Sequence, residues 1–331
     1  MAVTRSPRRS SGLARRSLLL GAAALAASPA RAQAFPSKPV QLVVPLGPGG
    51  INDIVTRLIA AKLGEAWGQS VVVVNKPGAG GMIGSDSVAK AAPDGYTILM
   101  CYSSHFANPS LYSKLPYDTL RDFAPVTMIN TANLVLTASP SVPVNSVQEL
   151  IALAKAKPGT LNYGTSGIGS LGHLAALRFA KALGIEVTHV PYKSAPEVIN
   201  AMLRGDVGFF FDSPITALPF IRSGKVKALA VTSPARSPVM PEVPTIAEAA
   251  MPGFEVLGWN GMLAPAGTPK PVIDTLNTAV VRVLRMPDIV KQLADQGVDV
   301  VGNTPDEFAA IISADIAKWR EIIVAAGIKL D

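Results

Sequence analysis

Two glycine-rich segments carry residue types that could bind an anion. The first, residues 45–53, reads PLGPGGIND, and the second, residues 163–173, reads YGTSGIGSLGH. Glycine lets the backbone turn tightly and present consecutive N–H groups, which join the first unpaired amides of a helix in a concave site for negative charge. In the second segment the hydroxyls of Thr165, Ser166 and Ser170 add donors. We expect each segment to hold part of one small acid.

Each segment follows a short apolar run and precedes a helical pattern. Continuous apolar runs of this kind are typical of strands buried on both faces of a parallel sheet. In the first half we expect strands at 40–44, 71–74 and 96–100, with helices over 54–63, before Gly64, and over 83–92. In the second half we expect strands at 161–165, 187–191 and 207–211, with helices over 171–183 and 195–203. Ligands bind at the carboxyl ends of such strands, so both segments should border one crevice.

This repeated rhythm predicts an α/β fold of two lobes, each a sheet flanked by helices. A chain of 331 residues exceeds what one core usually supports. Extended segments at 133–138 and 255–262 are where the chain would cross between halves, forming a two-strand hinge. Two more helices are expected, over 272–284 and from Thr304, where Thr304, Pro305 and Glu307 form a capping box. Ser146 and Glu149 mark another helix start.

The charge distribution indicates an exported chain. The net charge is +7, but six arginines and no acids lie in residues 1–34, which leaves 24 basic and 23 acidic side chains. The rest of the chain is therefore close to neutral and has no electrostatic preference for nucleic acid or anionic lipid. Residues 1–34 read as a signal peptide, too short in its apolar run to span a bilayer, cleaved near Ala32 or Ala34 in the periplasm. The pair Arg15 and Arg16 also resembles a twin-arginine signal.

Several enzyme classes are poorly supported. The spacing Gly167-x-Gly169-x-x-Gly172 matches a dinucleotide fingerprint, which makes a periplasmic nicotinamide-dependent oxidoreductase a rival, but no acid ends the next strand to bind the ribose. Neither Ser166 nor Ser170 has the G-x-S-x-G spacing of a hydrolase. We expect no metal site, because the three histidines lack ligand spacing, and no cofactor. The single cysteine, Cys101, is expected to be a buried structural thiol.

Four residues keep two interpretations. Asp53 either reads the polarity of a ligand or complements the dipole of its helix. Asp212 either caps a helix or pairs with a ligand amine or hydroxyl in the cleft. His173, in a first helical turn, is more typical of a surface or capping residue than of a catalytic base. Trp259 is expected to pack in the core or hinge.

The order of the motifs resembles the Bug-type receptors of the tripartite tricarboxylate transporter family over nearly the whole mature chain. The resemblance rests on the following segments: VP…PGG…D (44–53), NKPGAGG (75–81), His105 with NPSLY (108–112), LPYD (115–118), NYGTSG…S (162–170), HVPYK (189–193), LAPAGTP (263–269) and KW (318–319). The family often has an aromatic residue and a proline where this chain has Leu46 and Gly47, and a glycine where it has Ser194. These departures leave the identity of the ligand open.

The resemblance implies a periplasmic-binding-protein type II fold that captures a small organic acid in an interlobe cleft for a membrane permease, without enzymatic activity. A ligand-sensing subunit for a signalling receptor is the alternative. The implied domains are residues 1–34 as signal peptide, 35–132 and 258–331 as lobe 1, and 133–257 as lobe 2, in a monomer. The implied ligand-binding residues are Gly49, Gly50, Asn52, Asp53, Ser103, Ser104, Asn108, Thr165, Ser166, Gly167, Ser170, Ala195 and Asp212.

Overall fold

The computed structural model describes residues 1–2, 35–326 and 329. The chain divides into two units, Met1–Ser37 and Lys38–Asp331, and every described helix and strand belongs to the second. Residues 3–34 of the expected signal peptide lie outside the described residues. No helix within the described part of the chain has both the length and the hydropathy to cross a membrane.

One lobe is built on a six-stranded mixed sheet with the order β11-β4-β10-β3-β1-β2. Strand β1 is parallel to β2 and β3, whereas β10 is antiparallel to β3 and β4. The strands are β1 (Val40–Val44), β2 (Val71–Asn75), β3 (Thr97–Tyr102), β4 (Phe123–Asn133), β10 (Leu257–Pro265) and β11 (Asp299–Val300). The predicted strands at 40–44, 71–74 and 96–100 are therefore confirmed to within two residues.

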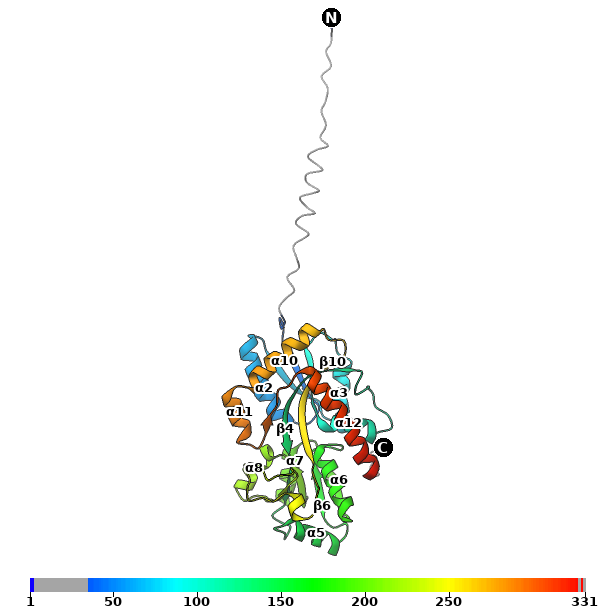
Figure 1. Ribbon diagram of the computed structural model, residues 1–331, viewed down its shortest axis with the longest axis vertical. Helices are drawn as coiled ribbons and strands as arrows, with labels where there is room; N and C mark the ends of the chain where they lie inside the picture. The colour runs from blue at the N-terminus through cyan, green and yellow to red at the C-terminus, as the bar shows by residue number, and fades with distance from the viewer. Residues whose placement is uncertain (3–34, 327–328, 330–331) are drawn as a thin grey trace. The chain divides into compact units, whose positions relative to one another are not determined.

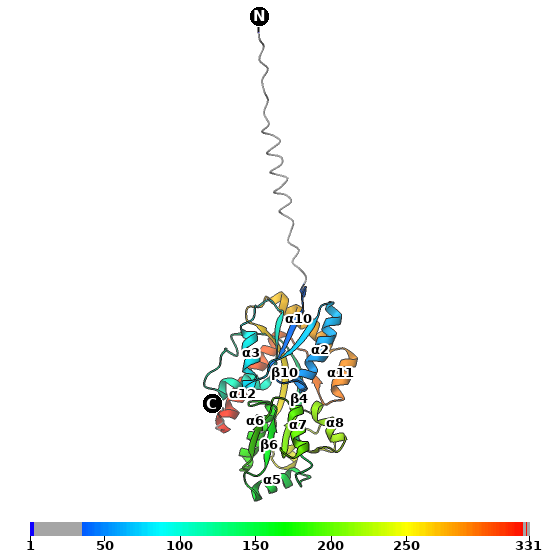
Figure 2. The same ribbon diagram turned by 180° about the vertical axis from the view of Figure 1, so that it is seen from behind.

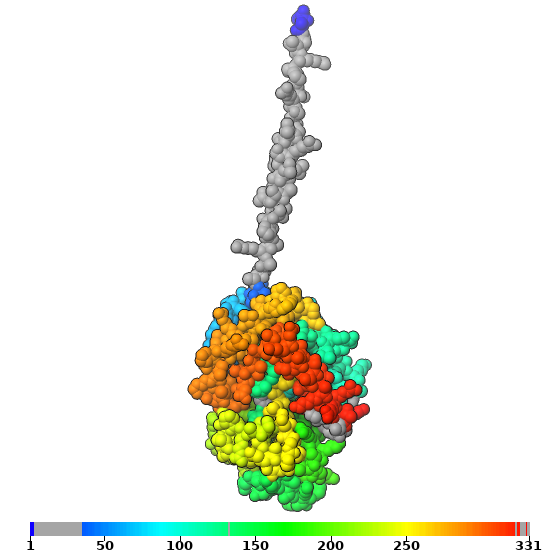
Figure 3. Space-filling view, in the orientation of Figure 1, coloured from blue at the N-terminus to red at the C-terminus, as the bar shows by residue number. Residues whose placement is uncertain are grey.

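Helices cover both faces of this sheet (Figure 1). They are α2 (Ile51–Trp67), α3 (Met82–Ala89), α4 (Asn108–Leu111), α10 (Lys270–Leu284), α11 (Pro287–Ala294) and α12 (Pro305–Ala326), with the 3-10 turns η1 (Ala79–Gly81) and η2 (Ser103–Ala107). Val43 and Leu99 pack in one buried cluster with Phe308 of α12. Because side chains alternate along a strand, their neighbours face the opposite side, where α2 and α10 contact each other. Figure 3 shows α10, α11 and α12, in orange to red, on the surface of this lobe.

The second lobe contains a five-stranded sheet with the order β7-β6-β8-β5-β9. Its elements are β5 (Val135–Ala138), α5 (Val147–Ala156), β6 (Asn162–Thr165), α6 (Leu171–Leu183), β7 (Thr188–Pro191), α7 (Ala195–Arg204), β8 (Phe209–Asp212), α8 (Pro214–Arg222), β9 (Lys227–Val231) and α9 (Ile246–Ala249). Phe209 and Phe211 pack with residues of α5 and α6, and Phe210 packs with α7 on the other face. The apolar run before Asp212 is thus a central strand buried on both faces.

The chain passes between the two sheets twice. Strand β4 ends at Asn133 and β5 begins at Val135, and the return follows β9 into β10 (Figures 1 and 2). These are the extended segments expected at 133–138 and 255–262. The two lobes are therefore joined by a two-strand hinge.

The start of α12 and the end of α2 can be compared with the predicted helix limits. Thr304 Oγ1 accepts from the Glu307 N–H at 3.2 Å and Glu307 Oε2 accepts from the Thr304 N–H at 2.9 Å, which confirms the predicted capping box. The prediction that the first helix stops before Gly64 is wrong. It continues to Trp67 and ends at Gly68, whose φ of 62° is the left-handed conformation that glycine adopts at a helix terminus.

Candidate functional site

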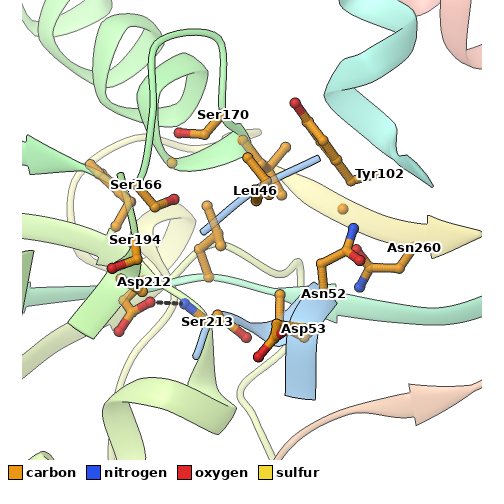
Figure 4. Close-up of a pocket in the computed structure, with 18 of the residues that line it drawn as sticks. Leu46, Asn52, Asp53, Tyr102, Ser166, Ser170, Ser194, Asp212, Ser213 and Asn260 are labelled. Carbon is orange, nitrogen blue, oxygen red and sulfur yellow. Dashed lines mark hydrogen bonds between the residues drawn. The ribbon is translucent and has the colours of Figure 1, made fainter. Parts of the chain in front are cut away.

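A cavity of about 100 Å³ lies where loops of the two lobes meet (Figure 4). The loop after β1 and the loop after β6 both border it, as the position of parallel strand ends predicts. Its wall consists of Leu46, Gly47, Gly50, Ile51, Asn52, Asp53, Tyr102, Ser103, Leu134, Ser166, Ser170, Leu171, Gly172, Lys193, Ser194, Ala195, Phe210, Phe211, Asp212, Ser213, Gly258, Trp259 and Asn260. The wall is mostly apolar with a few polar groups, as is usual for a small-ligand site.

Four helices begin at this wall. The first residues or N-caps of α2, α6, α7 and α8 all contribute to the lining. Gly50, Ser194 and Ser213, the N-caps of α2, α7 and α8, make no side-chain hydrogen bond to their helices. A helix N-terminus carries partial positive charge on unpaired N–H groups, so the cavity favours an anion without any buried cation.

Asp53 fixes the first loop. Its Oδ2 accepts from the Gly49 N–H at 3.0 Å and from Arg57 Nε at 3.0 Å, while Oδ1 accepts from Asn75 Nδ2 at 2.9 Å. Burial raises the pKa of Asp53, but the hydrogen bonds from Arg57, Gly49 and Asn75 outweigh burial and hold the pKa below its ordinary value. Both oxygens are satisfied within the protein, so the structure favours the interpretation of Asp53 as a structural residue of the loop.

Two stacked histidines support the second loop. His173 Nδ1 accepts from the Gly169 N–H at 3.0 Å, and its ring lies 4.2 Å from the ring of His189. His189 Nε2 in turn lies 2.7 Å from Thr165 Oγ1. Burial, with a smaller effect of His189, lowers the pKa of His173 to about 3, so the ring stays neutral and can accept this hydrogen bond. The surface interpretation of His173 is therefore wrong, because only 3 % of the residue is exposed.

The lobes touch each other beside the cavity. The Gly47 N–H of the first loop donates to the Lys193 carbonyl of the other lobe at 3.2 Å. Leu46, Ser166 and Lys193 also border a second cavity of about 490 Å³, which is lined further by residues 77–82 and Tyr112. The small cavity therefore adjoins a larger space at these three residues, with Leu46 shown near the middle of Figure 4.

Most of the chain matches the sequence model of one protein family. Residues 55–328 match the model of the tripartite tricarboxylate transporter family receptor. The chain belongs to this family. The predicted resemblance is confirmed.

Relatives of this receptor cover nearly its whole length. It is 37 % identical to protein BugT of Bordetella pertussis over 306 residues, 92 % of this chain and 94 % of that protein. A Rhodopseudomonas palustris protein solved with adipate aligns with a TM-score of 0.86 at 37 % identity, covering 89 % of this receptor and all of that chain. MatC from the same organism, solved with malate, aligns with a TM-score of 0.84 at 34 % identity, covering 87 % and 100 %. These alignments confirm the predicted two-lobed fold.

Most of the predicted site residues of the receptor meet at the cavity. Those on its wall are Gly50, Asn52, Asp53, Ser103, Ser166, Ser170, Ala195 and Asp212. The other five lie outside this wall: Gly49, Ser104, Asn108, Thr165 and Gly167. Of these, Gly49 and Thr165 are bound to Asp53 and His189, and Gly167 lines the larger cavity. The amide of Asn52 donates to the Met100 carbonyl at 3.0 Å, so Asn52 ties α2 to β3.

Ser104 and Asn108 are buried in the lobe and do not line the cavity. Asn108 Nδ2 donates to Tyr117 Oη at 3.4 Å, and Ser85 Oγ lies 3.2 Å from His105 Nδ1. Burial holds the pKa of His105 at about 3. Ser104 Oγ has no hydrogen-bond partner among the described residues, so the structure places Ser104 and Asn108 in the interior of the lobe and gives neither a contact with the cavity.

The sequence reasoning missed several wall residues. Ser194 and Ser213 are N-caps followed closely by proline. The helix after Ser194 was predicted, but the one after Ser213 was not, although the same pattern was a usable signal for it. Tyr102 and Asn260 come from hinge-side strand ends, where no local motif marks them. Trp259 is both core and wall, as its expected packing role allowed.

Asp212 is the one wall carboxylate without an ion-pair partner among the described residues. Its Oδ1 accepts from the Ser213 N–H at 2.8 Å and from Thr216 Oγ1 at 2.6 Å. Burial raises its pKa to about 7 despite these two hydrogen bonds. The interpretation of Asp212 as an N-cap is wrong, because Ser213 is the N-cap of α8 and Asp212 binds only the Ser213 N–H and the Thr216 hydroxyl. Asp212 does border the cavity, as the alternative interpretation requires.

Within the described part of the chain, no group of three or more His, Cys, Asp and Glu side chains has the arrangement of a metal site. Cys101 is fully buried in β3, and burial raises the pKa of its thiol, which confirms the structural interpretation.

Proposed function

We propose that this receptor captures a small organic acid between its lobes in the periplasm and delivers it to a membrane permease of the tripartite type. The observation that carries the proposal is the convergence of four helix N-termini on one cavity that contains no buried cationic side chain among its lining residues. Such a site stabilises a carboxylate through backbone N–H groups and hydroxyls. Adipate and malate in the related solved proteins support this class of ligand.

Closure of the lobes is the second part of the proposal. We take residues 35–132 and 258–331 as one lobe and 133–257 as the other, hinged where β4 and β10 leave the larger sheet. An acid bound first to one lobe would gain the donors of the second lobe on closure, and exclusion of water would strengthen each hydrogen bond. The closed form would then be the state that the permease recognises, after removal of residues 1–34.

A thermal-shift screen of the receptor against three- to six-carbon carboxylates tests the proposal. A ligand that binds only the native state raises the melting temperature, by an amount that increases with its concentration relative to Kd. We expect at least one acid to raise it clearly, and X-ray scattering to show a smaller radius of gyration with that acid. Absence of any shift across the panel would contradict the proposed function.

The hydroxyls of the second loop give a sharper prediction. The double variant Ser166→Ala, Ser170→Ala should bind the acid at least tenfold more weakly in calorimetry, because each hydrogen bond to a charged group contributes ~1.5–3 kcal/mol. Ser170 also caps α6 by accepting from the His173 N–H at 3.3 Å, so we expect a loss of about 1 kcal/mol in the free energy of unfolding.

Ser146→Ala is the matched control for this loss of a cap. Ser146 Oγ accepts from the Glu149 N–H at 3.1 Å at the start of α5, away from the cavity wall. It should lose similar stability without any change in affinity. Equal affinities of the double variant and this control would mean that the second loop is only a structural turn.

A further inference from the structure

Two neighbouring buried atoms on the cavity wall lack partners among the described residues. They are Asp212 Oδ2 and Ser213 Oγ, at the point where β8 leads into α8. Asp212 is 3 % exposed and Ser213 is 6 % exposed, and both line the cavity (Figure 4). Buried polar atoms in native proteins are nearly always hydrogen-bonded, so two adjacent exceptions at a ligand cavity need an explanation.

Hydrogen bonds at the start of α8 satisfy only one oxygen of the Asp212 carboxylate. Oδ1 accepts from both the Ser213 N–H and the Thr216 hydroxyl, which fix the plane of the group. Oδ2 takes no part in these two hydrogen bonds. They thus hold the carboxylate in one orientation and leave its second oxygen without a partner.

Among residues 35–326, no cationic side chain forms an ion pair with Asp212. Arg57 pairs with Asp53, and Lys193, which also lines the cavity, has an exposed side chain and makes no ion pair with Asp212 among the described residues. The residues beside Asp212 on the wall, Phe210 and Phe211, are apolar. Burial raises the pKa of Asp212 to about 7, so its ionised form is costly near neutral pH unless a donor reaches Oδ2.

We propose that Asp212 Oδ2 and Ser213 Oγ form a specificity subsite for a hydrogen-bond donor that the ligand carries beside its carboxylate, namely a hydroxyl or an ammonium group. This inference rests on the proposed function, because it assigns the ligand class of the same cavity. A hydroxyl donates to Asp212 and accepts from Ser213, while an ammonium group donates to both oxygens. The favoured ligands are small hydroxy acids or amino acids, in keeping with a cavity of about 100 Å³.

Calorimetry at pH 8 with three matched series tests the subsite. The series are propionate, lactate and alanine; succinate, malate and aspartate; and glutarate, 2-hydroxyglutarate and glutamate. At this pH Asp212 is mostly ionised, since its pKa is about 7. We expect the hydroxy or the amino member of a series to bind at least tenfold more tightly than the unsubstituted acid, because a site built for a donor discriminates against a ligand that lacks one.

The variant Asp212→Asn separates the two kinds of donor. An amide can still donate to a hydroxyl oxygen but has no charge for an ammonium group, so a preference for the amino acid should fall to near one and a preference for the hydroxy acid should fall less. Ser213→Ala should reduce only the preference for the hydroxy acid. Asp206→Asn, an exposed aspartate of the same lobe, is the control for loss of one negative charge and should leave every preference unchanged.

The outcomes distinguish failure of the Asp212 subsite from failure of the proposed function. If no acid of the thermal-shift panel binds, the proposed function fails and the subsite fails with it. If acids bind but the unsubstituted member is equal or tighter in every series, the subsite is overturned while the proposed function stands. Preferences that survive unchanged in Asp212→Asn would also overturn the assignment to Asp212.

Discussion

Replacing Gly47 by alanine is expected to weaken acid binding by at least tenfold while leaving the free energy of unfolding of the unliganded protein nearly unchanged. A Cβ at this position would lie 2.3 Å from the Lys193 carbonyl oxygen and 3.0 Å from the Lys193 carbonyl carbon and Ser194 Cβ, all in the other lobe. The nearest of these atoms belongs to the backbone at the start of α7, so it cannot move aside cheaply. The clash therefore acts only when the lobes are together.

The loop itself tolerates alanine. Gly47 does not have a left-handed φ, unlike Gly49 with a φ of 81°, so the substitution adds no backbone strain within its own lobe. Overpacking of this kind typically costs about 1–3 kcal/mol, and each 1.4 kcal/mol is a factor of ten in Kd. The closed form would carry that cost and the open form would not.

Calorimetry measures the affinity of Gly47→Ala, and X-ray scattering with saturating acid measures its closure. Gly64→Ala, inside α2, is the control, because its Cβ would lie at an ordinary 3.5 Å from the Gln69 carbonyl oxygen just beyond the end of that helix. The control should bind normally and be slightly more stable, since alanine is the better helix former. Normal affinity in Gly47→Ala would show that this contact between lobes is not part of the liganded state.

The sequence predicted the elements better than the cavity, for a physical reason. Strand β1 and helix α6 were predicted at their observed limits. Their limits are set by local features of the sequence, namely a buried apolar run for β1 and a serine cap and Gly184 for α6. The end of α2 was missed because Gly64 and Gly68 are both candidate terminators. Only tertiary contacts, such as the packing of Leu63, decide between them.

Convergence of separate segments cannot be read from local patterns. The two glycine-rich loops were found because each is a continuous motif that follows a strand. The starts of α7 and α8 reach the same cavity only through the order of strands β7-β6-β8, which no local pattern specifies. Likewise, the complete burial of Ser104 in η2 could not be predicted from the sequence. The direction of its side chain depends on how that turn packs against α12.

The second large effect concerns stability and follows from Asp212. The pKa of its carboxyl is about 7 in the folded protein against an ordinary value of 3.8, because burial disfavours the ionised form. Between these two pH values the folded state binds a proton that the unfolded state has released, so stability falls as the pH rises through this window. Well below the ordinary pKa of 3.8 both states are protonated and the cost of the buried charge disappears.

Asp212→Asn removes this cost. An amide oxygen can still accept from the Ser213 N–H and the Thr216 hydroxyl, so both hydrogen bonds at the start of α8 are retained. We therefore expect the variant to gain stability over the wild type as the pH rises from 4.5 to 8, by on the order of 2–4 kcal/mol in the absence of ligand. Urea unfolding at four pH values measures the difference.

The exposed Asp206→Asn provides the comparison, because it should follow the wild type at every pH. A constant difference between Asp212→Asn and wild type across the range would mean that Asp212 is not ionised at a cost in the folded protein. The expected result links stability to specificity. A residue whose replacement stabilises the unliganded receptor at pH 8 while reducing discrimination between ligands is retained for binding, since a site that must pair with a ligand is less stable without it.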